Sequence, residues 1–277
     1  MTRFNDFSRQ SFLGNASIQI LAETRVAIVG LGGGGSHIAQ QLAHLGVGQI
    51  RLIDPQEIEA SNLNRIIGAT AKDVIARTPK VKIAERLIQS IRPSTKVDVA
   101  QNEWQHVDHL LKDAHVIFGC VDGYRQRMYL ESAARRFCLP YIDIGMDVVN
   151  ISADTYAVAG QMIMTLPDGP CMKCLGFLSQ DRLDKEENAY GAAGITPQVV
   201  WTNGTLASLA VGAFVRLFTP WFNNTRNFEW LELEGNNQLV TQSPQPKYNI
   251  KGLCCHYSPE ERGDSFFDIR QSQLTTN

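Results

Sequence analysis

The sequence predicts an α/β protein with a Rossmann-like, doubly wound and mostly parallel sheet. Three observations support this class. Short β-branched segments alternate with helical periods over residues 25–145, which is typical of a parallel sheet covered by helices. A glycine-rich loop directly follows the first of these segments. The chain has 277 residues, 44% of them hydrophobic and 19% charged, which excludes a mainly disordered protein.

The first βαβ unit comes from residues 25–54. A β-branched run at 25–30 predicts a strand, an amphipathic stretch at 36–45 a helix, and an apolar run at 49–54 a second strand. The alternation continues with a helix over 80–91, a strand at 96–100, a helix near 106–111, a strand at 115–120, a helix over 124–137 and a strand at 141–144. Strands separated by helices indicate a parallel sheet with both faces covered.

The pattern changes past residue 145. Extended segments at 151–159 and 161–165, together with a strand-like run at 228–233, predict an appended antiparallel portion. The apolar window 199–218 is interrupted by polar residues, so it is interpreted as a buried helix rather than a membrane span. The charged segment at 181–188 is predicted to be a mobile surface loop.

Charge and termini narrow the functional classes. Lys and Arg number 26 against 28 Asp and Glu, so no net positive field attracts bulk nucleic acid or an anionic membrane. The first ten residues lack the apolar run of a signal peptide, and no lipidation motif is present. We therefore expect a cytoplasmic protein that binds no membrane.

The glycine-rich loop is the strongest sign of a nucleotide site. Its G-x-G-x-x-G spacing is formed by Gly30, Gly32, Gly33 and Gly35. Because the loop joins a strand to a helix, backbone N–H groups and a helix N-terminus converge where a phosphate can bind. Asp54 ends the next strand, where a carboxylate commonly binds ribose hydroxyls. These features alone fit an NAD-dependent oxidoreductase equally well.

Cations that follow Asp54 favour a triphosphate over a dinucleotide. Asn62, Arg65 and Lys80 stand shortly after Asp54 in the chain. Hydride transfer needs no such cluster of two cations and an amide. Cleavage of a triphosphate, in contrast, develops negative charge that Arg, Lys and a metal ion neutralise.

Seven motifs in order resemble the ThiF/MoeB family of ATP-dependent activators of ubiquitin-like proteins, also called the ThiF/MoeB/HesA family. They are Arg9-Gln10, the loop from Gly30 to Gly35, Asp54, Ser61 to Arg65, Pro79-Lys80, Cys120-Val-Asp122, and the stretch Gly169-Pro-Cys-Met-Lys-Cys174. The resemblance runs from about residue 9 to about residue 218 and resumes near residue 254. Each motif is weak alone, but their common order is specific.

The resemblance implies a role for each charged position. Asp54 would bind the ribose, and the triphosphate would be contacted by Asn62, Arg65 and Lys80. Asp122 would hold Mg²⁺ near the α-phosphate. Arg9 would reach the ATP of a neighbouring subunit, which implies a homodimer. The structural alternatives are a solvated terminal residue for Arg9, a solvated helix face for Arg65 and Lys80, and a helix N-cap for Asp122.

The cysteines predict a structural zinc site. Cys171 and Cys174 form a Cys-x-x-Cys pair, and Cys254, Cys255 and His256 follow some eighty residues later. Zn²⁺ takes four such ligands in a tetrahedron, so the fourth is either Cys255 or His256. The alternatives are a redox dithiol or simply buried thiols. The two other cysteines, Cys120 and Cys138, are expected to be core residues.

The resemblance implies one ThiF-type adenylation domain over residues 1–277. Residues 1–24 would be an N-terminal arm, 25–145 the nucleotide-binding half, and 146–277 a partner-binding half with a crossover loop at about 176–196. The enzyme would be an adenylyltransferase that converts the C-terminal carboxylate of a small ubiquitin-like or sulfur-carrier protein, ending in Gly-Gly, into an acyl-adenylate.

Several alternatives stay open. Enzymes of the same fold adenylate a short peptide or a modified tRNA base, and more distant alternatives are an NAD-dependent oxidoreductase and a non-catalytic scaffold subunit. No cysteine occurs from residue 175 to 253, so we expect no thioester cysteine in the crossover loop. Exchange at Cys254 or Cys255 is the competing possibility.

Overall fold

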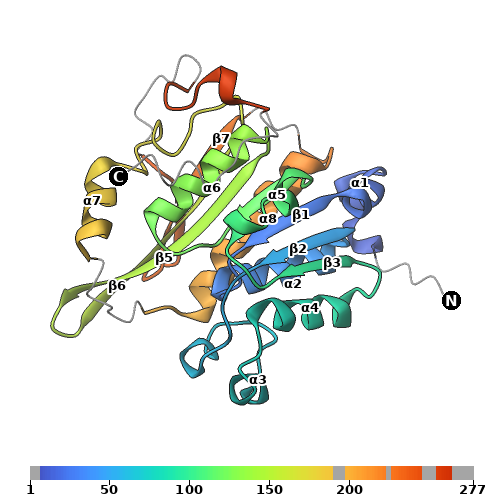
Figure 1. The fold of residues 1–277 in the computed structure, drawn as a ribbon, viewed down its shortest axis with the longest axis horizontal. Coiled ribbons are helices and arrows are strands. Elements are labelled where there is room, and N and C mark those ends of the chain that lie inside the picture. Colours follow the sequence, from blue (N-terminus) through green and yellow to red (C-terminus); the bar gives the residue numbers. More distant parts are fainter. Residues whose placement is uncertain (1–6, 190–196, 223–225, 245–253, 264–277) are drawn as a thin grey trace.

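The computed structural model describes residues 7–189, 197–222, 226–244 and 254–263. These residues form one sheet with the strand order β3-β2-β1-β4-β5-β6-β7-β8 (Figure 1). The first five strands are parallel to one another, and β6, β7 and β8 are antiparallel to their neighbours. The predicted class, a mostly parallel sheet with an antiparallel C-terminal portion, is therefore confirmed.

The described elements have the following bounds. The strands are β1 (Arg25–Val29), β2 (Gln49–Ile53), β3 (Lys96–Ala100), β4 (Val116–Gly119), β5 (Tyr141–Ser152), β6 (Thr155–Thr165), β7 (Phe228–Glu234) and β8 (Leu239–Gln242). The α-helices are α1 (Ser17–Glu23), α2 (Gly33–Leu45), α3 (Ala71–Ile75), α4 (Lys80–Ile91), α5 (His109–Lys112), α6 (Tyr124–Arg136), α7 (Gln180–Ala189) and α8 (Val200–Phe218). Short 3₁₀ turns are η1 (Ser8–Leu13), η2 (Ala60–Asn62), η3 (Trp104–His106) and η4 (Pro259–Glu261).

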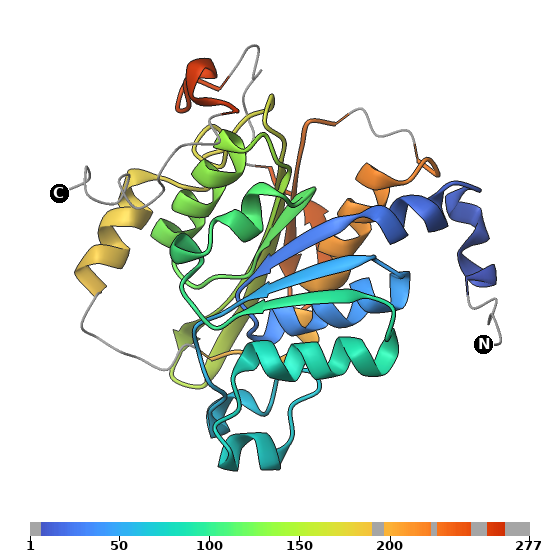
Figure 2. The same cartoon turned by 45° about the vertical axis from the view of Figure 1, so that its right-hand side comes forward.

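Helices cover both faces of the sheet (Figures 1 and 2). On one face, α2, α4 and α8 bury a core that includes Leu42, Ile88 and Phe214. On the other, α5 and α6 pack with the segment around Met172 over a second core. Both cores draw on residues before and after 145, so the two halves of the chain share one interior. Among the described helices, none has the length and apolar character that a membrane crossing requires.

Strand β5 links the parallel and antiparallel parts of the sheet. Its N-terminal end pairs with β4 in parallel, from Tyr141 to Asp143. Its whole length pairs with β6 in antiparallel register, from Tyr141 opposite Thr165 to Ser152 opposite Thr155. The predicted strand at 141–144 is therefore too short, because the backbone stays extended through residue 152 on a partner that the sequence did not pair with it.

The predicted mobile loop at 181–188 is wrong, since these residues lie in α7. Leu183 on this helix is buried, and the guanidinium of Arg182 lies 5.5 Å from the ring centre of Tyr124. A carboxylate oxygen of Glu186 accepts a hydrogen bond from the backbone N–H of Arg125, at 2.9 Å. The charges that suggested a solvated loop thus fix one face of a helix against α6. Residues 190–196 of the predicted crossover loop lie outside the described residues.

Other differences concern short elements. The predicted helix near 106–111 is divided into η3 and α5, and α1, α3 and β8 are elements that were not predicted. Each of these elements has seven residues or fewer, too short for a hydrophobic period to stand out. The helix at 80–91 and the strand at 96–100 have the predicted bounds.

Candidate functional site

Two adjoining cavities open at the C-terminal ends of the parallel strands, where ligands bind in open α/β sheets. The smaller, about 310 Å³, contains the glycine loop and Asp54; we call it the nucleotide cavity. The larger, about 850 Å³, extends over β5 and β6; we call it the outer cavity. Both cavities are lined by Pro55, Gln56, Arg65, Lys80, Asp122, Arg127, Gly145, Met146 and Gln198. A ligand in one cavity therefore borders a ligand in the other.

The glycine loop is shaped by close backbone contacts. A Cβ on Gly35 would lie 1.9 Å from the carbonyl oxygen of Gly30, so no side chain fits there. Gly30 has a φ of +90°, which favours glycine. Gly32, in contrast, has no atom within 4 Å of its Cβ position and lines the nucleotide cavity. Helix α2 begins at Gly33 with no side chain capping its N-terminus, which leaves N–H groups for an anion.

Asp54 is placed beside this loop by two backbone hydrogen bonds. One carboxylate oxygen accepts from the N–H of Leu31 at 2.6 Å, and the other from the N–H of Gln56 at 2.8 Å. The residue is only 5% exposed but lines the nucleotide cavity. Each carboxylate oxygen keeps a second lone pair, so Asp54 can still accept from ribose hydroxyls.

Arg65 and Lys80 are cations without a carboxylate partner among the described residues. The Arg65 guanidinium donates to the carbonyl oxygen of Ser61 at 2.6 Å, and the Lys80 ammonium donates to the side-chain oxygen of Gln56 at 2.5 Å. Lys80 is 8% exposed. A largely buried ammonium bonded only to neutral oxygen gains strongly from a nearby anion. Asn62, on η2 beside them, also lines the outer cavity.

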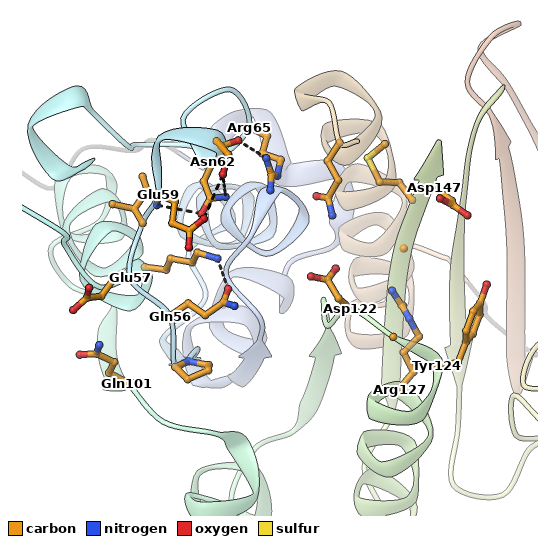
Figure 3. Close-up of a pocket in the computed structure, with 18 of the residues that line it drawn as sticks. Gln56, Glu57, Glu59, Asn62, Arg65, Gln101, Asp122, Tyr124, Arg127 and Asp147 are labelled. Carbon is orange, nitrogen blue, oxygen red and sulfur yellow. Dashed lines mark hydrogen bonds between the residues drawn. The ribbon is translucent and has the colours of Figure 1, made fainter. Parts of the chain in front are cut away.

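Asp122 follows β4 and lies across the outer cavity from Asn62 and Arg65 (Figure 3). It is exposed and lines both cavities. Mg²⁺ is commonly bound through one or two carboxylates together with substrate phosphates, so a single accessible carboxylate at this place fits that ion. The structure thus brings Asp54, Asn62, Arg65, Lys80 and Asp122 to one cleft.

Arg127 is a residue of this cleft that the sequence analysis missed. Its guanidinium contacts the carboxylate of Asp143 and donates to the carbonyl oxygen of Ile144 at 2.9 Å. The hydroxyl of Tyr141 donates to the other oxygen of Asp143 at 2.8 Å. Burial raises the pKa of Asp143, while the charge of Arg127 and the bond from Tyr141 act against that rise. Its place in the sequence could have indicated this: Asp122 lies just before α6 and Arg127 lies in the first turn of that helix, so both side chains are near the same strand end.

Other wall residues gave no signal in the sequence. Asp147 on β5 and Gln161 on β6 reach the outer cavity because paired strands place them there, and Tyr124 begins α6 at its rim (Figure 3). None of them belongs to a motif, so only the strand register could reveal them.

Arg9 lies near the N-terminal ends of the strands, whereas the cleft is at their C-terminal ends, and its neighbour Gln10 donates to the carbonyl oxygen of His44 at the far end of α2. It belongs to η1, which leads through α1 into the N-terminal end of β1, whereas the glycine loop follows the C-terminal end of that strand. A five-residue strand spans about 16 Å. Within one chain, the structure therefore does not bring Arg9 to the other predicted site residues.

Three cysteines and a histidine form a second constellation at the far end of α6. The ligand atoms of Cys171, Cys174, Cys254 and His256 all lie within 4.8 Å of one another. The sulfur atoms of Cys171 and Cys174 are 3.6 Å apart, and those of Cys174 and Cys254 3.5 Å. Zn–S bonds of about 2.3 Å in a tetrahedron require S···S distances of about 3.8 Å. The geometry thus favours His256 over Cys255, because the sulfur of Cys255 does not belong to the group of ligand atoms that lie within 4.8 Å of one another.

Buried charges of α6 hold this constellation. Glu131 is fully buried and accepts from the N–H of Met172 at 3.0 Å. Arg135 donates to the carbonyl oxygens of Gly169 and Pro170 at 3.1 and 2.7 Å. Burial raises the pKa of Glu131, and the charge of Arg135 opposes this rise. The Cys-x-x-Cys turn is thereby fixed on α6 by charged groups as well as by its cysteines.

The two remaining cysteines differ in their surroundings. Cys138 is exposed, so the prediction of a core residue is wrong: it follows α6 in a turn with a φ of +55°, which directs its side chain outward. Cys120 packs against the core as predicted, but it is only partly buried and also lines the nucleotide cavity, because β4 ends there. Burial nevertheless raises the pKa of the Cys120 thiol, and Asp143 raises it further.

The fold and cleft define a nucleotide-binding α/β enzyme. The sequence matches the ThiF family over residues 7–250, and the chain belongs to this family. The sulfur carrier protein ThiS adenylyltransferase of Escherichia coli (strain K12) is 28% identical over 215 residues, covering 74% of this chain and 79% of that protein. The predicted family and the predicted enzyme class, a nucleotidyltransferase, are thereby confirmed.

Two further relatives differ in extent. The SAMP-activating enzyme E1 of Haloferax volcanii is 29% identical over 157 residues, which cover 56% of this chain and 54% of that enzyme. Among solved structures, E. coli MccB with ATP has a TM-score of 0.72 at 19% identity, covering 90% of this chain and 74% of that chain. At that identity the likeness shows the shared fold alone.

The glycine loop generates a first prediction. Gly35→Ala should destabilise the fold by more than about 2 kcal/mol, because its Cβ would overlap the Gly30 carbonyl. Gly32→Ala should keep the melting temperature and weaken ATP binding, because its methyl group projects only into the cavity. Thermal unfolding and ATP titration of both variants check this. Equal melting temperatures for the two variants would contradict the described loop geometry.

Proposed function

We propose that this enzyme uses ATP to adenylate the C-terminal carboxylate of a small ubiquitin-like or sulfur-carrier protein. The observation that carries the proposal is the junction of the two cavities, where Arg65, Lys80, Asp122 and Arg127 line both. An adenylation site must hold the α-phosphate of ATP next to a carboxylate that arrives from another molecule. The names of the relatives, ThiS adenylyltransferase and SAMP-activating enzyme, support this class of substrate.

The lining of the cleft supports one direction for the bound ATP. Asp54 would accept from the ribose, and the N-terminus of α2 with Gly32 would contact phosphate oxygens. Asn62, Arg65 and Lys80 would contact the triphosphate at the shared wall. When bound at Asp122, Mg²⁺ would supply positive charge for the phosphate oxygens. In this arrangement the α-phosphate faces the outer cavity.

The reaction needs alignment and charge rather than proton transfer. A carboxylate oxygen of the partner forms a bond to the α-phosphorus, the bond from that phosphorus to the bridging oxygen of the β-phosphate breaks, and pyrophosphate leaves. The incoming carboxylate is already ionised near neutral pH, so no general base is required. Arg65 and Lys80 would offset the charge that develops on the leaving pyrophosphate.

The outer cavity supports an extended protein terminus as the second substrate. Its wall includes Gly145 and Asp147 on β5 and Gln161 on β6, which form part of an open sheet face. A terminal Gly-Gly has no side chains to obstruct the approach to the junction. A short peptide or a modified tRNA base is the alternative substrate, and NAD-dependent hydride transfer is the more distant one. The outer cavity and its cations have no evident use in hydride transfer.

Pyrophosphate exchange tests the proposed chemistry. With Mg-ATP, a folded Gly-Gly-terminated carrier protein and labelled pyrophosphate, label should enter ATP. Asp122→Ala should reduce exchange by about 100-fold or more, because the metal charge at the phosphate is lost. Asp154→Ala, an exposed acidic residue in the turn between β5 and β6, is the matched control and should leave exchange unchanged. Absence of exchange with every folded carrier tested would contradict the proposal.

A homodimer with Arg9 acting in trans is the second part of the proposal. It is supported by the position of η1 near the N-terminal ends of the strands, away from the glycine loop at their C-terminal ends, because Arg9 can then reach only the ATP of another copy. Phe12, on the same short turn, is 68% exposed and contacts the exposed Trp221, which places apolar surface beside Arg9.

Complementation tests the shared site. Arg9→Ala and Asp122→Ala homodimers should both be inactive, whereas an equimolar mixture that exchanges subunits should regain about a quarter of the activity. Half of the dimers are then mixed, and each has one site with both residues intact. The measurement is adenylation by the mixture relative to the wild type. No recovery despite demonstrated subunit exchange would contradict action in trans.

A structural zinc ion at the cysteine–histidine constellation is the third part. Three sulfur atoms and one imidazole nitrogen form a closed set of four ligands, which is typical of a structural rather than a catalytic zinc site.

The six cysteines form no disulfide, which fits a reducing compartment. We therefore propose a cytoplasmic location together with the zinc ion.

Adjacent cysteines provide a matched test of the ligand set. Cys254→Ala should lose zinc and lower the melting temperature, whereas Cys255→Ala should keep about one zinc per chain and near wild-type stability. Metal analysis and thermal unfolding of the two proteins check this. Loss of zinc in Cys255→Ala would contradict His256 as the fourth ligand, whatever Cys254→Ala shows.

We further propose that the acyl-adenylate is the final product on this enzyme, without a thioester. The segment that contains Cys255 is bonded to the C-terminal end of α6, since Gly263 donates to the carbonyl of Arg136 at 2.7 Å. Asp122 lies just before the other end of that helix. The twelve residue steps from Tyr124 to Arg136 span about 18 Å, so the segment of Cys255 and the carboxylate of Asp122 are separated by the length of the helix.

Denaturing gels without reductant test this last point. Enzyme, ATP and carrier protein should yield carrier–AMP and no reductant-labile adduct of enzyme with carrier. The Cys255→Ala variant should give the same result, because the thiol of Cys255 has no part in the proposed reaction. An adduct that forms on the wild type and disappears in Cys255→Ala would contradict the proposal.

A further inference from the structure

One wall of the nucleotide cavity has a polar arrangement that the proposed chemistry does not use. Beyond Asp54, this wall consists of Asn102, Glu103 and Trp104, which follow β3, and of Gln126 on α6. In the sheet, β2 lies between β3 and β1. Asp54, which follows β2, is therefore flanked by the glycine loop after β1 and by these wall residues after β3. They are positioned to surround whatever is attached to the ribose on the side away from the phosphates.

The hydrogen bonds of Gln126 fix the direction of its side-chain amide. Its oxygen Oε1 accepts from the indole Nε1 of Trp104 at 3.3 Å and from Nε2 of Gln105 at 3.2 Å. Both donors are nearly buried, at 2% and 7% exposure. Exchanging the amide oxygen and nitrogen would place N–H groups against N–H groups, so the orientation is set by its surroundings.

The fixed amide leaves a donor group available. Within the described part of the chain, Nε2 of Gln126 has no hydrogen-bond partner, although the residue is half-buried and lines the cavity. An amide NH₂ held in this way can donate but cannot accept. Because the hydrogen bonds to Oε1 already hold the side chain of Gln126 in one conformation, little conformational entropy is lost when a ligand accepts a hydrogen bond from Nε2.

We infer that Gln126 reads the nucleotide base by donating a hydrogen bond to a ring nitrogen of adenine. The inference rests on the proposed binding of ATP, with the ribose at Asp54 and the phosphates at the glycine loop. In that direction the base lies against the wall formed by Trp104 and Gln126. Adenine offers unprotonated ring nitrogens N1, N3 and N7 as acceptors. Trp104 acts here as a positioning residue, since it holds the oxygen of Gln126.

Deaza analogues of ATP test the contact atom by atom. Dissociation constants are measured for ATP, 1-deaza-ATP, 3-deaza-ATP and 7-deaza-ATP with the wild type. One analogue should bind about 5- to 10-fold more weakly than ATP, because a C–H replaces the accepting nitrogen. The same measurements follow on Gln126→Glu, which still accepts from Trp104 and Gln105 but has no N–H to donate.

In Gln126→Glu the penalty for that analogue should disappear, so that ATP and the analogue bind within about 2-fold of each other. The new negative charge weakens all four nucleotides, and comparing the analogues within one protein removes this effect. Gln41→Glu on α2, where the side chain bonds to Ser208 outside both cavities, is the matched charge control and should keep the wild-type penalty. Thermal unfolding confirms folding, and Gln126→Met replaces the variant if it does not fold.

The outcomes separate the inference from the proposed function. Equal binding of all four nucleotides to the wild type, or a penalty that persists in Gln126→Glu, would overturn the role of Gln126 while ATP binding stands. If the folded wild type binds none of the nucleotides, the proposed function fails and the inference with it.

Discussion

Helix α6 is fixed at both ends by buried charges, and the two functional constellations depend on it. Near its start, Arg127 pairs with Asp143 beneath the cleft, beside Asp122. Near its end, Glu131 and Arg135 hold the Cys-x-x-Cys turn through backbone groups. Buried charges are costly unless each is paired and hydrogen-bonded, so these contacts specify one position for the helix on the sheet. The cleft and the cysteines are therefore placed by one rigid element.

Much of the fold could be predicted from periodicity alone. The helix at 80–91 and the strand at 96–100 follow local patterns, because the apolar side chains on one face of each pack toward the same core. The antiparallel half could not be predicted in detail. Strand β5 runs to Ser152 because β6 pairs with it along its whole length, and α7 is a helix because Arg182 and Glu186 contact α6. These are long-range contacts that a local window does not contain.

The candidate site shows the same division. Asp54, Arg65, Lys80 and Asp122 could be predicted because each follows a strand end or lies in a family motif, and the structure brings them to one cleft. Gln126, Asp147 and Gln161 could not, because strand order and helix position alone bring them to the cavities. The cysteines illustrate a third case. Spacing did not distinguish His256 from the adjacent thiol, whereas the structure brings a ring nitrogen of His256 within 4.8 Å of the three cysteine sulfurs.

The continuity of β5 has a consequence for how this chain can be divided. Its first residues complete the parallel sheet with β4, and the same strand begins the antiparallel sheet with β6. A cut near residue 145 would pass through a strand and leave each fragment with an unpaired edge, which is a template for aggregation. Helix α8, from the later half, also covers the core beside α2. Separate expression of the halves should therefore yield two insoluble fragments rather than two domains.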